Sequence, residues 1–296
     1  IVKNYRNFMS SINPDNLIVS IGLPVFNGEI LLKKRIDSIL NQTCKNFELI
    51  ISDNASTDGT RKICEEYQKY DDRIQYICQK KNNGPTENFR FVLFHAKAKY
   101  FVWAASDDLW EPTFLSKNID LLESNSSIMG SISEVDFLGK YADRYNSKSA
   151  KIIKNKHVRP FSGSFSEKAK IALLTGDTMI YAVYRTNLLK KCMPTEEHFR
   201  DGMILMLSLL KFGDFSVYDK ILMHRSADGV SSIGRIHSMK QNKATNLDIL
   251  LMFLPLIKWS LNHLGIKFLI TNLNVYMRIF YVGYGRIILD LIRKIK

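Results

Sequence analysis

Two adjacent carboxylates, Asp107 and Asp108, follow a short apolar run in the segment YFVWAASDDLW. Acidic side chains at the end of a buried strand are costly unless a cation meets them. In open α/β sheets, ligands bind at the carboxyl ends of the strands, and a divalent metal that carries a phosphorylated substrate is a natural partner for this pair. Because adjacent residues on a strand end point in opposite directions, one can bind a metal while the other anchors the loop or a sugar hydroxyl. The alternative is that both residues cap the helix expected near Pro112.

A second carboxylate, Asp53, directly follows the apolar run FELIIS. In this position it can accept a hydrogen bond from a nucleobase or a ribose hydroxyl. Asp58 lies near the start of the next helical segment, where capping is a sufficient role. The loop PVFNGE, from Pro24 to Glu29, can offer backbone groups to a ligand or can be a simple turn between strand and helix.

A third loop, NNGPTENF, combines a Gly84-Pro85 turn with the start of a helix. The positive end of that helix, with Lys80 or Lys81, can meet a phosphate, although a solvated face is the favoured explanation of the two lysines. Asn83, Gly84 and Asn88 are the residues of this loop that we expect to line a binding site.

The elements that position these loops alternate between strand and helix patterns. Strands are predicted over 17–26, 47–52, 73–78 and 100–106, and helices over 29–43, 57–70 and 86–98. Such alternation with short links predicts βαβ units and a mainly parallel, Rossmann-like sheet flanked by helices. The four loops then lie at the carboxyl ends of successive strands and converge on one crevice.

The second half is less regular. Helices are predicted over 111–122 and 199–213, strands over 128–139 and 214–225, and a strand followed by a helix over 177–191. Residues 150–163 suggest an exposed strand or loop, and the Ser- and Gly-rich stretch 226–235 suggests a mobile loop. We therefore expect one α/β domain over residues 1–240 and a separate helical region over 241–296.

Four segments together resemble a family 2 glycosyltransferase with the GT-A fold: VSIGLPVFNGE, FELIISDNASTDGT, NNGPTENF and YFVWAASDDLWEP. The resemblance covers residues 17–225 and is strongest over 17–115. It implies inverting transfer from a nucleotide-diphosphate sugar, with UDP favoured, to a hydroxyl of a glycan or lipid-linked glycan. It also implies that Pro24, Asn27, Glu29 and Asp53 hold the base and ribose.

The same resemblance implies a metal motif at Ala105-Ser106-Asp107. Many relatives carry Asp at both ends of this motif, whereas this chain has Ala105 at the first end. Asp107 is therefore the expected direct ligand of Mn²⁺ or Mg²⁺, with Asp108 beside it. His224 is a further candidate metal ligand, or else a core residue.

A catalytic base and a phosphate contact are implied in the second half. The base is expected at the start of a helix, and Asp201 is preferred over Glu197 and Glu196. Inverting transfer needs a carboxylate to remove the proton of the acceptor hydroxyl. Arg225 is expected to bind the diphosphate through its planar fork.

Composition limits the partners and the compartment. The chain has 296 residues and a net charge of +13, which implies an anionic partner without choosing among nucleic acid, membrane and phosphorylated ligand. The four cysteines are not spaced as zinc ligands, and the polar N-terminus lacks a signal peptide, so we expect a reduced, intracellular protein. The sequence contains no stretch of about 18 uninterrupted apolar residues, so we do not expect a conventional membrane span.

The region 241–296 is apolar, helical in period and basic, with interleaved Trp and Tyr. It predicts an interfacial membrane anchor, an oligomerisation surface or a subdomain packed on the core. Basic residues beside apolar stripes favour anionic lipid. We therefore expect peripheral attachment to the cytoplasmic face of a bacterial inner membrane.

Three other classes remain as alternatives. A nucleic-acid-binding protein would explain the positive charge, but no nucleic-acid-binding module is recognised, and nucleic acid is not an expected partner. An NAD-dependent oxidoreductase would explain the βαβ start, but G-x-G-x-x-G is missing after the first strand. An inactive GT-A scaffold would explain Ala105.

Overall fold

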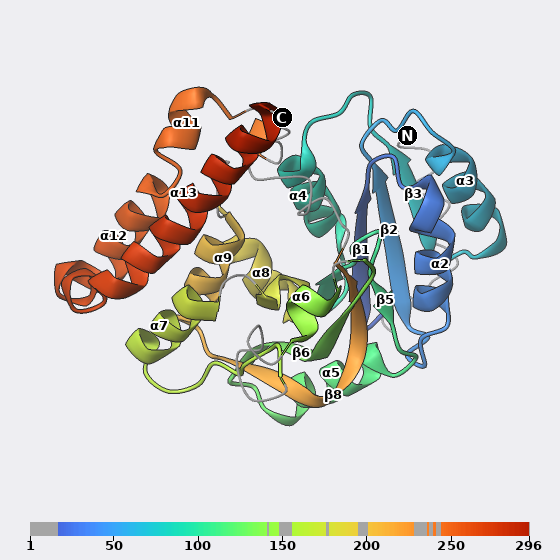
Figure 1. The fold of residues 1–296 in the computed structure, drawn as a ribbon. Helices are drawn as coiled ribbons and strands as arrows, with labels where there is room; N and C mark the ends of the chain where they lie inside the picture. The colour runs from blue at the N-terminus through green and yellow to red at the C-terminus, as the bar shows by residue number, and fades with distance from the viewer. Residues whose placement is uncertain are drawn as a thin grey trace.

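One sheet of eight strands organises the part of the chain that the structure describes. This computed structural model describes residues 17–140, 142–147, 156–175, 178–194, 201–227, 236, 239–240 and 244–295. The strand order is β3-β2-β1-β4-β7-β6-β8-β5. The predicted α/β fold with C-terminal helices is confirmed, and the sheet is mixed, with a parallel half and a second half of both orientations (Figure 1).

The first half alternates strand and helix as the sequence predicts. Its elements are β1 (Val19–Val25), α2 (Glu29–Leu40), β2 (Phe47–Asp53), α3 (Thr60–Tyr70), β3 (Ile74–Cys78), α4 (Pro85–His95) and β4 (Tyr100–Trp103). These four strands are parallel, and α2 and α3 lie on one side of them while α4 lies on the other (Figure 1). Gly22 is required where β1 meets α4, because a Cβ there would lie 2.7 Å from Phe101 and Val92 side-chain atoms.

The second half closes the sheet with antiparallel and parallel pairs. Its elements are β5 (Leu109–Trp110), α5 (Phe114–Ser124), β6 (Ile128–Leu138), α6 (Ala142–Asn146), α7 (Phe165–Thr175), η2 (Thr178–Tyr181), β7 (Val183–Arg185), α8 (Thr186–Cys192), α9 (Asp201–Leu209) and β8 (Asp214–Ser226). β7 pairs antiparallel with both β4 and β6, whereas β6 and β8 are parallel. β5 pairs antiparallel with β8, which brings Leu109 opposite His224.

Two expected elements differ in detail. The helix after the carboxylate pair begins at Phe114, later than expected, because Glu111 still donates its backbone N–H to Leu222 and so extends the β5 pairing. Residues 178–181 form a 3₁₀ turn, and the expected strand there is reduced to the three residues of β7. The predicted segments 1–16, 150–155 and 228–235 lie outside the described residues.

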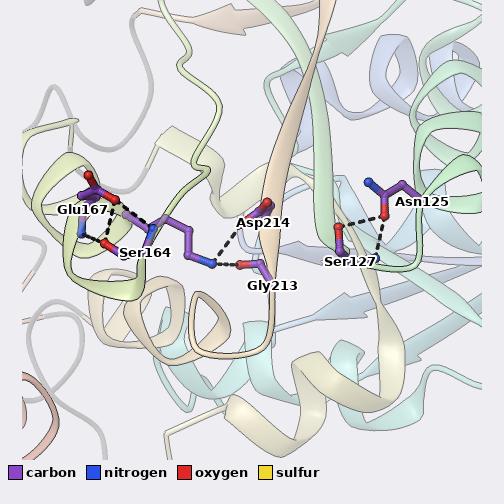
Figure 2. Close-up of polar contacts among 7 residues, drawn as sticks. Asn125, Ser127, Ser164, Glu167, Gly213 and Asp214 are labelled. Atoms are coloured by element: carbon purple, nitrogen blue, oxygen red, sulfur yellow. Dashed lines mark hydrogen bonds and ion pairs between the residues drawn. The ribbon is translucent and has the colours of Figure 1, made fainter.

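A polar cluster fastens α7 to the start of β8. Lys168 is buried on α7, and its Nζ donates to Gly213 O at 2.8 Å and to Asp214 Oδ1 at 2.9 Å. Figure 2 shows Ser164 and Glu167 closing the first turn of α7, and Asn125 and Ser127 closing the turn before β6. Gly213 was predicted as a helix end, but its main constraint is close packing, since a Cβ there would lie 2.1 Å from Ser127 O.

The C-terminal region is helical, as predicted. It contains α11 (Asn246–Leu250), α12 (Leu254–Thr271) and α13 (Leu273–Ile295). α12 and α13 form a hairpin beyond α7 and α9, and α13 packs against α7 (Figure 1). Pro255 lies in the first turn of α12, and Gly265 interrupts that helix with a φ of 80°. Among the helices that the structure describes, none has the length and apolarity needed to cross a membrane.

Candidate functional site

The first two loops are joined directly by hydrogen bonds. β1 and β2 end in register, with Val25 opposite Asp53. Asn27 Oδ1 accepts from the backbone N–H of Thr57 at 2.9 Å, and Glu29 Oε2 accepts from that of Gly59 at 2.9 Å. Two of the residues expected to hold the nucleoside therefore also shape its loops. Pro24, the third of them, is buried within β1.

Asp53 is completely buried at the end of β2. Its Oδ1 accepts from the backbone N–H of Ser56 at 2.8 Å, and its Oδ2 accepts from the Tyr76 hydroxyl at 2.8 Å. Burial, followed by this bond to Asp53, raises the pKa of Tyr76. Because Asp53 is completely buried, a nucleoside can contact its carboxylate only after neighbouring groups move.

The third loop is held to the second by buried asparagines. Asn54 donates its Nδ2 to Gly84 O at 3.1 Å, and its Oδ1 accepts from the backbone N–H of Asn83 at 2.9 Å. Asn88 donates its Nδ2 to Ser52 O at 2.9 Å. This side chain, which we expected to line the binding site, is therefore hydrogen-bonded to β2. Gly84 has a φ of 91°, a conformation that favours glycine.

A small cavity lies beside this third loop. Its volume is about 210 Å³, and it is lined by Asn54, Gln79, Asn83, Glu87, Asn88, Arg90, Phe91, Phe94 and His95. Asp53, Asp107 and Asp108 do not line it. Ligand sites for drug-sized molecules usually occupy about 300–1,000 Å³, so this cavity is too small to hold a whole nucleotide sugar.

The fourth loop lies against the first. Ala104 continues the β4 pairing by donating its N–H to Gly22 O at 2.8 Å. A Cβ added at Gly28 would lie 3.9 Å from Ser106 Cβ, so the first and fourth loops are close neighbours here. All four predicted loops therefore gather at one edge of the sheet.

The structure gives the two adjacent carboxylates different surroundings. Asp108 is buried, and its Oδ1 accepts from the backbone N–H of Ser226 at 3.0 Å while its Oδ2 lies 3.4 Å from Arg225 Nε. Asp107 is half-buried, and no hydrogen bond or ion pair joins its side chain to another residue in the described part of the chain. Burial, followed by the charge of Asp108, raises the pKa of Asp107. Asp108 thus anchors the loop, and Asp107 is left with unused carboxylate oxygens.

Arg225 reaches the same anchor from β8. Its guanidinium also lies 4.7 Å from the ring centroid of Tyr181 and 5.8 Å from that of Phe137. Its predicted contact with a diphosphate stays a prediction.

His224, expected as a metal ligand or a core residue, lies between two carboxylates. Its Nδ1 is 2.6 Å from Asp136 Oδ1, and its Nε2 is 2.8 Å from Glu111 Oε1. Burial alone would lower the pKa of His224, but the hydrogen bonds with Glu111 and Asp136 outweigh it and raise this pKa. A metal could bind His224 only by displacing one of these carboxylates.

The three residues predicted as candidates for the catalytic base lie where the described part of the chain resumes, at the start of α9 or just before it. Asp201 begins α9, as expected for a residue at a helix start, while its side chain lies outside the described part. Glu196 and Glu197 also lie outside it. Within the described residues, no three His, Cys, Asp or Glu side chains are grouped closely enough to hold a metal by themselves.

The sequence reasoning missed Arg35, which is completely buried beside this site. Arg35 Cζ lies 4.0 Å from the ring centroid of Trp110. Arg35 follows Lys33 and Lys34 in the sequence, and such a basic run does not by itself point to a buried side chain. A signal was present, because Leu32, Arg35, Ile36 and Ile39 share the spacing of one buried helix face.

Comparison with known proteins identifies the family. Residues 20–191, more than half of the chain, match the model of glycosyl transferase family 2. The chain belongs to glycosyl transferase family 2. This membership agrees with the resemblance carried by the four loops.

Individual relatives extend the likeness. A GalNAc(5)-diNAcBac-PP-undecaprenol beta-1,3-glucosyltransferase of Campylobacter jejuni is 27% identical over 216 residues, which cover 70% of this chain and 64% of that protein. Three other relatives that are named as glycosyltransferases match over only 39%, 21% and 43% of their own length.

Two solved structures show the same fold. Staphylococcus aureus TarS 1-349 in complex with UDP-GlcNAc has a TM-score of 0.59 at 19% identity, and the alignment covers 79% of this chain and 67% of the TarS chain. The mannosyltransferase PcManGT of Pyrobaculum calidifontis, in complex with GDP-Man and Mn²⁺, has a TM-score of 0.53 at 12% identity. This alignment covers 99% of this chain and 87% of the PcManGT chain.

Replacing His224 with Gln tests the role of the histidine between its carboxylates. Because the folded state raises this pKa, the wild-type advantage is fully present below the ordinary value near 6.5 and is lost as pH rises through the folded pKa. We expect His224→Gln to lower the free energy of unfolding by about 1–3 kcal/mol at pH 5.5 and by less at pH 9. Urea unfolding at both pH values measures this, and an equal loss at both would contradict it.

Proposed function

We propose that this protein transfers a sugar, with inversion, from a nucleotide-diphosphate sugar to a hydroxyl of a glycan or lipid-linked glycan. The observation that supports the proposal best is the half-buried, unpaired Asp107 at the sheet edge where the loops after β1, β2 and β4 gather. A family 2 fold with free carboxylate oxygens at this edge is suited to a donor that carries phosphates. A uridine nucleotide is the favoured donor, since UDP-GlcNAc is the ligand named for TarS.

The residues present fit a metal that arrives with the donor. Mg²⁺ and similar cations are usually held by one or two carboxylates together with substrate phosphates. Asp107 has unused oxygens, and the buried Asp108 Oδ2 has no hydrogen-bond partner, although Arg225 lies beside it. We propose that Asp107 holds Mn²⁺ or Mg²⁺, as the Mn²⁺ of PcManGT suggests by analogy. When bound, the metal would stabilise the charge of the departing diphosphate.

The remaining roles belong to this chain's own residues. Asp53, once uncovered, would bind the nucleoside through its carboxylate, within loops shaped by Asn27 and Glu29. Arg225 would add charge beside the diphosphate. Asp201 would take the proton of the acceptor hydroxyl as that oxygen attacks the anomeric carbon of the sugar.

We further propose that the helical region 241–296 rests on an anionic membrane. Fifteen of its large apolar side chains are exposed: Leu247, Leu250, Leu251, Leu254, Leu261, Ile266, Ile270, Leu273, Met277, Tyr281, Val282, Ile288, Leu289, Leu291 and Ile292. Only nine others are exposed in the rest of the described chain. This concentration of exposed apolar side chains on α11, α12 and α13 supports an interaction surface in this region.

The charges of this region favour lipid phosphates. Its two acidic residues are engaged: Asp248 accepts from the backbone N–H of Thr245, the N-cap of α11, and Asp290 accepts from the backbone N–H of Ile236. The basic residues Lys258, Lys267, Arg278 and Arg286 form no ion pair within the described residues. A lipid-linked acceptor, as in the name of the Campylobacter relative, would then be presented at the same surface.

Replacing Asp107 with Ala should weaken Mn²⁺-dependent UDP binding by about 100-fold or more, because the variant loses the charged oxygen ligand. Isothermal titration with and without Mn²⁺ measures this. Asp120→Ala, which removes an exposed carboxylate on α5, serves as the control. Unchanged Mn²⁺-dependent affinity in Asp107→Ala would place the metal elsewhere.

Replacing Asp201 with Asn should leave UDP-sugar affinity nearly unchanged and lower turnover by about 10²–10⁴-fold, since a general base is lost. Glu197→Gln is the matched comparison. If Glu197→Gln loses turnover and Asp201→Asn does not, the base is Glu197. A wild-type chain that binds the donor but turns over no acceptor would be the inactive scaffold.

Replacing both Tyr281 and Ile270 with Asp should lower the affinity for phosphatidylglycerol vesicles, measured by sedimentation, by about 100-fold or more, because each apolar side chain buried in lipid contributes about 1.5–3 kcal/mol. These side chains are 82% and 64% exposed. Tyr70→Asp, at an 84% exposed site on α3, is the control and should bind like the wild type. Equal binding to neutral phosphatidylcholine vesicles would contradict the charge argument.

A further inference from the structure

A second cavity lies in the C-terminal region, between α11 and the C-terminal half of α13 (Figure 1). Its volume is about 300 Å³. Tyr284 lines it, together with five aliphatic side chains: Ile236, Ile249, Leu250, Ile287 and Leu291. The residues expected to bind the donor do not line this cavity, so it is separate from the candidate site at the sheet edge.

Hydrogen bonds hold the walls of this cavity in place. The Tyr284 hydroxyl donates to Leu250 O at 2.6 Å and so joins α13 to α11. Asp290 on α13 accepts from the backbone N–H of Ile236 at 3.0 Å. Ile236 is buried, whereas Leu250 and Leu291 are 63% and 50% exposed. The cavity therefore extends from buried side chains to the exposed apolar surface of α11 and α13.

The aliphatic lining decides which kind of ligand the cavity suits. A water molecule needs two to four polar partners to be held in a cavity, and aliphatic walls offer none. A nucleotide or a sugar would leave most of its polar groups without hydrogen bonds, which is costly. A hydrocarbon chain has no polar groups to satisfy, and its transfer from water to such walls is favourable. The lining thus favours a hydrocarbon chain.

Two polar side chains line the same cavity. Lys240 and Asn246 are exposed, and neither side chain forms a hydrogen bond or an ion pair with a residue that the structure describes. One ammonium group beside an apolar cavity suits a hydrocarbon chain that ends in one negative charge. A phosphate diester carries one such charge, whereas a diphosphate carries more. The amide of Asn246 can donate to an ester carbonyl of the same lipid.

We propose that this cavity binds one acyl chain of an anionic phospholipid, with the lipid phosphate beside Lys240. Leu250 and Leu291 line the cavity and also belong to the exposed apolar surface that is proposed to rest on a membrane. A phospholipid is therefore the hydrocarbon chain that this cavity would meet. The inference rests on that proposed membrane contact and adds to it a site for a single lipid.

The test uses a lipid dissolved as single molecules, so that no membrane surface takes part. Dihexanoyl phosphatidylglycerol, kept below its critical micelle concentration, is titrated into the full chain by calorimetry. We expect saturable binding, several-fold tighter than that of dihexanoyl phosphatidylcholine and at least about tenfold tighter than that of glycerol 3-phosphate. Equal binding of either comparison compound would overturn the inference.

Ile249→Trp should weaken binding of this lipid by about tenfold or more, because a larger side chain fills the half-buried wall. Lys240→Gln should weaken it by about fivefold, because one cation is lost. Leu254→Trp and Lys258→Gln, at exposed positions on α12 outside the cavity, are the matched controls and should bind like the wild type.

Equal losses in the cavity variants and their controls would contradict the proposed site. If Ile249→Trp fails to fold, Leu291→Trp at a half-exposed position of the lining replaces it. Tighter binding of farnesyl phosphate, or a dimer that Ile249→Trp dissociates, would assign the cavity to the lipid of the acceptor or to a second copy of the chain. Either result would overturn the inference.

Vesicle sedimentation separates this inference from the membrane contact on which it rests. A wild-type chain that sediments with phosphatidylglycerol vesicles but binds no dissolved phosphatidylglycerol keeps the membrane contact and overturns the single-lipid site. Replacing both Tyr281 and Ile270 with Asp should weaken vesicle binding and leave binding of the dissolved lipid unchanged, because neither residue lines the cavity. A chain that binds the dissolved lipid but no vesicles would refute the membrane contact instead.

Discussion

The bond between Asp108 and the end of β8 is the constraint on which the candidate site depends. It joins residues 118 positions apart, Asp108 and Ser226, and it is reinforced by Arg225. Because Asp108 is fixed, its neighbour Asp107 is held half-exposed at the sheet edge. The two halves of the fold therefore meet at a carboxylate, and the geometry of the edge depends on both.

Charge balance connects this anchor with its surroundings. Arg35 comes from α2, and Arg225 and His224 come from β8. These cations from separate elements offset the acidic side chains of the loop before β5, of β6 and of Glu111 just after β5. Each of these groups would be costly alone in a buried place. The edge is thus a set of mutually compensated charges, in which Asp107 is the group with free oxygens.

Local patterns in the sequence predicted the first half of the fold well, because β1 to β4 and their helices follow short periodic segments. The antiparallel β7 and the long pairing of β6 with β8 could not be predicted from local patterns, since they depend on contacts between residues more than 50 positions apart. The gathering of the four loops was predicted from strand order. The cover that Tyr76 places over Asp53 and the burial of Arg35 were not, because both depend on tertiary packing that overrides the polar character of the residues.

The attachment of α13 to α7, together with the bond from Asp290 to Ile236, has a consequence for the acceptor. A hairpin fixed in this way would keep a constant distance between the α/β domain and any surface on which the hairpin rests. If it lies on a bilayer as proposed, the carboxylate edge stands at a set height above the headgroups. The site would then select lipid-linked glycans by their length, because only a glycan whose terminal hydroxyl reaches that height would be extended.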